Sequence, residues 1–172
     1  MTARAPLRRL ALTAHVVASV GWLGALTAFL VLAIVGLTSR DPDLVRGVYL
    51  ASEPLARYAI VPLAIAALAT GVIESLITSW GLIRHYWVVV KLVITVVATL
   101  VLLVYLRTVD HVAGVAASGA DLDAMRSPSF VLHAAAAIVL LLAATALAIH
   151  KPAGLTRHGW RRQRALRARG AA

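Results

Sequence analysis

The chain has no cysteine, and its charged and aromatic residues are scarce, so several classes of protein are excluded at once. The absence of cysteine excludes disulfide bonds, iron–sulfur clusters and thiol chemistry. Charged residues make up 14% and aromatic residues 6% of the 172 residues, whereas 61% are hydrophobic. Soluble domains carry about 25% charged and about 45–50% apolar residues. The composition therefore indicates an integral membrane protein.

Acidic residues are especially few, with seven against 17 basic residues and a net charge of +10. In a soluble domain this excess would suggest a nucleic-acid partner. Here the basic residues lie beside the ends of apolar segments, where membrane topology explains them better. We therefore expect no nucleic acid among the partners.

Long apolar segments, by contrast, are abundant. A transmembrane helix needs about 20 mostly apolar residues to cross ~30 Å of hydrocarbon. Four segments meet that length, at about 10–37, 54–79, 86–106 and 129–149. Their short connections favour one bundle over two domains. The sequence predicts an all-α polytopic membrane protein, with an antiparallel four-transmembrane-helix bundle over 1–152 and a basic tail over 153–172.

The charges predict the orientation of this bundle. Eleven basic residues flank the span ends on the side of the two termini, and five flank the opposite ends. The positive-inside rule makes the terminal side cytoplasmic, so we expect a bacterial cytoplasmic (inner) membrane protein with both termini inside. The lipid bilayer is the main expected partner, and a homo-oligomer is left open. The tail either binds anionic lipids through Trp160 and its arginines or is a solvated, disordered segment.

Local signals place helix ends between the first and second spans. Asp41-Pro42-Asp43 is a helix start, and we expect a short amphipathic helix there, lying on the outer surface. Ser52-Glu53-Pro54 is read as the cap of the second span, and Pro62 should kink that span. The segment 107–127 is rich in Ala, Gly and Asp, and predicts a mobile outer loop.

Three ionisable residues inside the spans are expected to lie at one depth. At ~1.5 Å per residue, His15, Glu74 and Lys91 each lie about 9 Å from the inner surface. Ionisable groups inside a span usually face the bundle interior or a water-filled cavity. We predict an ion pair between Glu74 and Lys91, on neighbouring helices. The pair either handles protons or fixes the register of the helices, and a third alternative has Lys91 reaching the inner interface without a partner.

The other candidate residues are a tryptophan and two histidines. Trp22 is seven residues from His15 and shares its helix face. His85 is close to His15 in depth, although its neighbours also suggest a place at the membrane interface. His133 lies near the outer end of the last span, ~20 Å from His15 in depth, so both cannot ligate one haem iron. A structural zinc or di-iron site lacks an adequate ligand set.

Two segments resemble a known group of proteins. The sequence HVVASVGWLG, from His15 to Gly24, resembles the first helix of small bacterial membrane proteins that include haem-containing protoporphyrinogen oxidase and copper-resistance D-like proteins. WVVVKL, which contains Lys91, resembles the third-helix motif of the oxidase. As a whole the chain looks like a family of predicted integral membrane proteins of high-GC bacteria, distantly related to the oxidase. The oxidase's Asn-Glu-x-Pro-like stretch is replaced here by Arg126-Ser127-Pro128-Ser129.

The resemblance implies a set of roles. His15 would ligate the iron of haem b, and Lys91 would be the functionally important lysine. From depth and charge, apart from the resemblance, we expect Lys91 and Glu74 as the catalytic residues and Trp22 and His85 beside the cofactor. The first hypothesis is thus an oxidoreductase that takes electrons from a porphyrin-type or quinone-type substrate. The alternative is a non-catalytic membrane scaffold or accessory subunit. A weaker alternative is transport of a metal or another small ion, against which the absence of a repeat or a broken helix argues.

Overall fold

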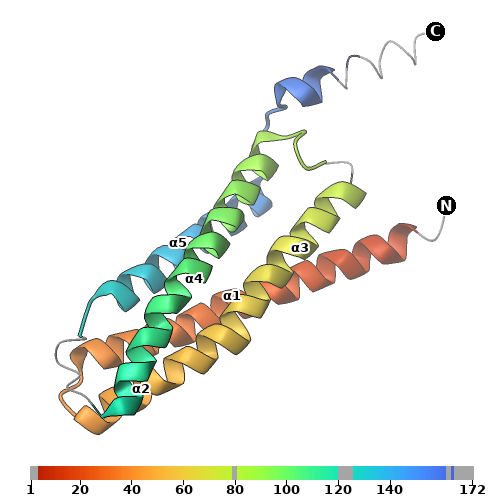
Figure 1. The fold of residues 1–172 in the computed structure, drawn as a ribbon. Helices are drawn as coiled ribbons and strands as arrows, with labels where there is room; N and C mark the ends of the chain where they lie inside the picture. Colours follow the sequence, from red (N-terminus) through yellow and green to blue (C-terminus); the bar gives the residue numbers. More distant parts are fainter. Residues whose placement is uncertain (1–3, 79–80, 120–125, 162–163, 165–172) are drawn as a thin grey trace.

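The computed structural model describes residues 4–78, 81–119, 126–161 and 164, and this part of the chain is almost wholly helical (Figure 1). Its elements are listed in chain order: α1 (Arg4–Thr38), α2 (Pro42–Leu55), a π-helical turn η1 (Ala56–Ile60), α3 (Val61–Ile77), α4 (Tyr86–Ser118) and α5 (Ser129–His150). Four helical segments are long and apolar enough to span a membrane: Ala5–Thr38, Pro42–Ile77, Tyr86–Ser118 and Ser129–His150. The predicted all-α class, with four helices long and apolar enough to span a membrane, is confirmed for the described residues.

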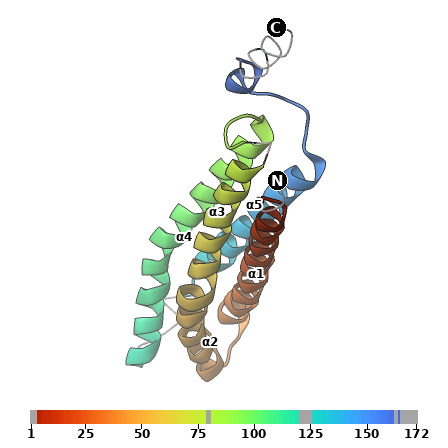
Figure 2. The same ribbon diagram turned by 90° about the vertical axis from the view of Figure 1, so that its right-hand side faces the viewer.

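The helices pack lengthwise between two ends of the molecule, visible in both ribbon views (Figures 1 and 2). The α2 end holds α2 and the last turns of α4. The terminal end holds the start of α1, the connection from α3 to α4, and the segment 151–161. Towards the terminal end, α1 diverges from α4 and α5 (Figure 1). The bundle is therefore tightest near α2 and widest near the chain termini.

The hydrophobic core lies nearer the α2 end and is rich in aromatic side chains. The rings of Phe29 and Phe130 stack with centroids 5.7 Å apart, and Tyr49 and Tyr105 meet Phe130 edge-on. Aromatic pairs in these geometries contribute beyond the area they bury. On the outward faces, large apolar side chains such as Val20, Val104 and Leu132 are more than 60% exposed. A lipid-facing surface accounts for this pattern, because lipid removes the usual cost of exposing apolar groups.

The second span differs from the prediction at its start. Asp41 caps α2 as predicted, with its carboxylate accepting from the backbone N–H groups of Asp43 and Leu44. However, α2 is not a separate surface helix, because it continues through η1 into α3. Ser52 is buried and donates back to the Val48 carbonyl, so the predicted cap at Ser52-Glu53-Pro54 is wrong. Amphipathic spacing identified the helix but could not reveal that the helix runs on.

The predicted kink at Pro62 corresponds to an irregular turn just before it. Pro62 has no N–H to donate to the carbonyl of Tyr58, so the regular pattern is interrupted there. The backbone widens over Ala56–Ile60, and the N–H of Val61 bonds to the carbonyl of Ala56, five residues earlier. Such π-helical turns commonly accommodate an extra residue within a helix.

The predicted mobile loop at 107–127 is wrong for residues 107–118, which continue α4. Val109, Val112 and Ala116 are buried against the rest of the bundle. Packing against α2 overrides the weak helix propensity of this stretch, and Gly119 ends the helix with φ = 78°, a left-handed conformation that glycine adopts easily. Residues 120–125 lie outside the described part.

Arginines at the α2 end hold neighbouring helices together. Arg46 donates to the carbonyl of Ala116 near the end of α4, and Arg126 donates to that of Ser39 just after α1, at 2.6 Å. Carbonyls at helix C-termini lack helical partners, and arginine side chains can supply the donor. Arg57 bonds both Glu53, at 2.5 Å, and Asp110, at 2.8 Å.

The segment after α5 folds back onto the connection between α3 and α4. The N–H of Thr156 donates to the Arg84 carbonyl at 3.0 Å, and that of Tyr86 to the Gly154 carbonyl at 3.3 Å. Residues 157–161 are helical. The predicted alternative of a disordered tail is therefore wrong up to residue 161. Lipid binding by the tail stays a prediction, and residues 162–163 and 165–172 lie outside the described part.

Candidate functional site

His15 of α1 donates hydrogen bonds to α3. Its Nδ1 lies 3.1 Å from the Ala67 carbonyl oxygen and 3.2 Å from Thr70 Oγ1. The Thr70 hydroxyl itself donates to the Ala66 carbonyl at 2.6 Å. Because a carbonyl oxygen only accepts, Nδ1 of His15 must carry the proton. The second nitrogen, Nε2, is then left with its lone pair.

Lys91 of α4 is the hydrogen-bond donor to that lone pair. Its Nζ lies 3.2 Å from His15 Nε2, so the amine donates to the unprotonated ring nitrogen. His15 therefore joins α1 to α3 through one nitrogen and to α4 through the other. The prediction that these two residues share one level of the bundle is confirmed by this contact.

Glu74 approaches the pair without forming the predicted ion pair. Its carboxylate is close enough to interact electrostatically with both His15 and Lys91. Among the described residues, however, the salt bridges within 4 Å are those of Arg57. The prediction of direct contact between Glu74 and Lys91 is wrong, because His15 takes the position nearest the amine.

The three side chains face a common cavity of about 370 Å³ between α1, α3, α4 and α5. This volume lies within the range of about 300–1,000 Å³ that is typical of small-molecule sites. Apolar residues form much of the wall, while hydroxyl groups and Lys151 add polar positions. The polar wall residues besides the three are Ser19, Ser75, Thr78, Thr95, Thr145 and Lys151. The divergence of α1 from α4 and α5 produces this space at the terminal end (Figure 1).

Gly71 of α3 makes room for the His15 ring. A Cβ at this position would lie 3.0 Å from Cε1 of His15 and 3.3 Å from its Nδ1. Sequence reasoning did not single out Gly71, Ala67 or Thr70 as site residues. The small side chain of Gly71 could have indicated a close approach between helices, but not that a histidine makes it.

Replacing Gly71 with alanine should therefore displace the His15 ring by a few tenths of an ångström. The matched control is Gly24→Ala on α1, where an added Cβ meets nothing within 4 Å. Gly24→Ala should stabilise the protein by ~0.5–1 kcal/mol through reduced backbone entropy. The free energy of unfolding of Gly71→Ala should be ~1–3 kcal/mol lower than that of Gly24→Ala, because the added methyl group overpacks the contact with His15. Reversible unfolding in mixed micelles measures both, and equal stabilities would contradict the contact.

Two other predicted site residues occupy different places. Trp22 lies in the wall of the cavity, is 1% exposed, and its Nε1 has no hydrogen-bond partner in the described structure. His85 precedes α4, pairs by backbone with Leu155, and its ring lies 6.5 Å from that of Trp87. It is not among the described residues that line the cavity. The structure therefore places Trp22 in the same cavity wall as His15, and it places His85 elsewhere.

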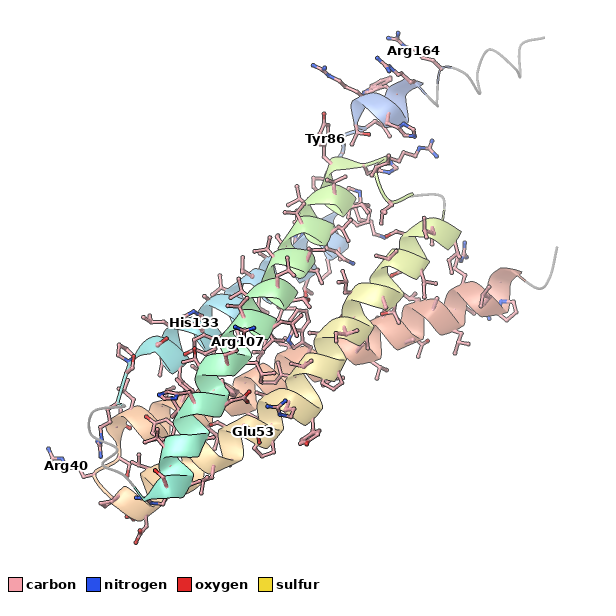
Figure 3. The ribbon with its side chains drawn as sticks, in the orientation of Figure 1. Arg40, Glu53, Tyr86, Arg107, His133 and Arg164 are labelled. Carbon is pink, nitrogen blue, oxygen red and sulfur yellow. The ribbon has the colours of Figure 1, made fainter. Side chains whose placement is uncertain are left out.

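His133 belongs to the other half of the bundle, as its predicted depth required. It is exposed on α5, towards the α2 end (Figure 3), and stacks on Tyr105 with ring centroids 3.9 Å apart. Within the described ranges, no group of three or more His, Asp or Glu side chains is arranged to hold a metal ion. A metal bound at the first cavity would rest on His15, with any further ligands supplied by a cofactor.

The chain was also compared with known proteins. No family of proteins matches the sequence, and neither the curated proteins nor the solved structures contain a significant match.

Proposed function

We propose that this is a multi-pass protein of the bacterial cytoplasmic membrane, an antiparallel bundle with both termini inside. The support is the distribution of charge relative to the two ends of the helices. The terminal end carries Arg8, Arg9 and Arg84 together with the basic residues that follow α5. Acidic residues other than Glu74 belong to the α2 end or to the segment 120–125. Positive-inside insertion then puts the terminal end in the cytoplasm.

We further propose that the cavity at His15 binds haem b. The observation that carries this proposal is the state of the imidazole. Metal-ligating histidines almost always donate their second N–H to a carbonyl, carboxylate or water, which fixes the ring and its tautomer. The bonds from Nδ1 to Ala67 and Thr70 do this for His15 and leave Nε2 as the metal-binding nitrogen.

The rest of the cavity suits a tetrapyrrole in its chemistry. Apolar side chains of four helices provide walls for a flat apolar ring, and Lys91 provides a cation for a carboxylate. Nε2 would bind the iron through the lone pair that now accepts from Lys91, so the amine would have to turn away. Glu74, in the same cavity wall, would stabilise the displaced ammonium.

Haem bound here would supply one-electron redox chemistry, with the protein setting the potential through its ligand, burial and nearby charges. Lys91 and Glu74 would hold or move the proton that accompanies each electron. The inferred role is therefore that of an oxidoreductase or electron-transfer subunit acting on a porphyrin-type or quinone-type donor.

Optical spectroscopy tests this proposal. The protein is expressed with added haem precursor, purified in detergent, and its absorption recorded oxidised and after dithionite reduction. We expect a Soret band that sharpens and shifts on reduction, at about one haem per chain. A colourless protein that also fails to take up haem in vitro would contradict the proposal.

A second candidate function is that of a scaffold or accessory subunit. It is favoured by one specific observation: the Lys91–His15–Ala67 chain of contacts already joins α1, α3 and α4 without a cofactor. A scaffold predicts that replacing His15 changes stability and leaves the absorption spectrum of the purified protein unaltered.

A further inference from the structure

A second cavity, of about 120 Å³, lies between α1, η1, α4 and α5, apart from the His15–Lys91–Glu74 group. Its wall is almost entirely apolar and includes Phe29, Ile60, Ala98 and Ala134. For comparison, an engineered apolar cavity of ~150 Å³ stays dry and binds benzene. This space is somewhat smaller, so it can hold at most a single ring.

Trp22 brings a buried hydrogen-bond donor to the wall between this cavity and the first one. Its indole lies in the wall of both cavities, is 1% exposed, and has an Nε1–H with no acceptor in the described structure. Buried donors are nearly always paired, with protein, water or ligand. The described protein supplies no acceptor, and the spaces beside the indole are the two cavities that it borders.

His133 gives the same cavity an acceptor. Its Nδ1 lies 2.8 Å from the Ser129 carbonyl oxygen, so Nδ1 carries the proton and Nε2 keeps a lone pair. The ring stacks on Tyr105, whose hydroxyl lies 2.9 Å from Ser129 Oγ, and both rings line the cavity. His133 is thus held in a fixed orientation by two neighbours. The wall carries a donor on α1 and an acceptor on α5.

The cavity also reaches the outer surface of the bundle. Val97 and Val101 of α4 are 47% and 48% exposed, Leu140 of α5 is 37% exposed, and all three belong to its wall. In a membrane this seam between α4 and α5 faces the acyl chains. A ligand with an isoprenoid or alkyl tail can enter laterally and leave its tail in the lipid.

We propose that this cavity binds the ring of a benzoquinone-type membrane quinone or its quinol. A ring that enters from the seam between α4 and α5 would lie between walls that contain Trp22 and His133. The Trp22 N–H would donate to one oxygen, and a quinol hydroxyl at the other would donate to His133 Nε2. The proposal is independent of haem binding at His15.

Binding of decylbenzoquinone to cofactor-free protein in nanodiscs tests this assignment. The readout is the amount of quinone that sediments with the protein-containing nanodiscs in excess of the amount that sediments with empty nanodiscs. We expect saturable binding near one per chain. Ala134→Leu places a larger side chain in the cavity and should abolish it, and Trp22→Phe should weaken it about tenfold. Ala98→Val serves as a smaller obstruction should Ala134→Leu fail to fold.

The matched control is Ala144→Leu, further along the same helix α5, in the wall of the first cavity. It should leave quinone binding unchanged and impair haem uptake, whereas Ala134→Leu should do the reverse. Non-saturable uptake, or full binding to Ala134→Leu, would overturn the proposal. So would a decyl-substituted benzene without oxygens that binds as tightly as the quinone, because the cavity would then be a purely apolar one.

Discussion

Replacing His15 with alanine is expected to weaken haem binding by more than ~100-fold and to remove the Soret band from the purified protein. Loss of an outer-shell partner alone typically costs 10–100-fold in metal affinity, and His15 is the proposed ligand itself. In the described cavity wall no second histidine could replace it. Titration of haem into detergent-solubilised variant and wild-type protein measures the change.

The control for this experiment is His133→Ala. His133 is also a histidine within a span, but it lies at the second cavity and is bonded to Ser129. Its replacement should leave the haem spectrum unchanged. An equal loss of haem from both variants would show that the effect is general destabilisation, and retention by His15→Ala would eliminate His15 as the ligand.

The second large effect concerns the coupling between Lys91 and His15. In a double-mutant cycle of His15→Ala and Lys91→Met, we expect an interaction free energy of ~1–2 kcal/mol. Residues in contact couple by ~0.5–3 kcal/mol, and polar pairs within membranes contribute ~1–2 kcal/mol in model peptides and ~0.6 kcal/mol on average in a natural membrane protein. The quantity is measured from the unfolding free energies of wild type, both single variants and the double variant, without cofactor.

Two comparison cycles make the result specific. Glu74→Gln with Lys91→Met should give a smaller coupling, because their side chains do not form a salt bridge. His133→Ala with Lys91→Met should be additive within ~0.5 kcal/mol, as expected for distant sites. A coupling of Lys91 to Glu74 that exceeds its coupling to His15 would restore the ion pair expected from the sequence and contradict the observed contact.

The sequence predicted the depth of the site residues in the bundle more accurately than it predicted their hydrogen-bond partners. Residue counts from the span ends give depth, because each residue of a helix rises ~1.5 Å. They placed His15 and Lys91 together, and the two are in contact. The direction in which a side chain points around the helix axis changes by about 100° per residue, and depth alone does not determine it. Residue counts therefore could not show that Lys91 would contact His15 rather than Glu74, although all three face one cavity.

The predicted boundaries of the helices were wrong for a related reason. The pattern around Ser52-Glu53-Pro54 satisfies the local chemistry of a helix start, yet the chain there is already helical. The Ala- and Gly-containing stretch after Arg107 looks like a loop, yet it packs on α2. Both outcomes depend on tertiary contacts between α2 and α4, which no local signal contains. Both cavities likewise depend on how the helices pack against one another, and the sequence does not encode that as a motif.

Nitrogen-15 NMR of histidine-labelled protein, with His15 identified by its absence in His15→Ala, tests the site most directly. In cofactor-free protein we predict a proton on Nδ1 and an unprotonated Nε2 that accepts from Lys91. Added haem should then perturb the Nε2 resonance selectively while Nδ1 keeps its proton. A proton on Nε2 in the cofactor-free protein, or a His15 signal unchanged by haem, would contradict the account.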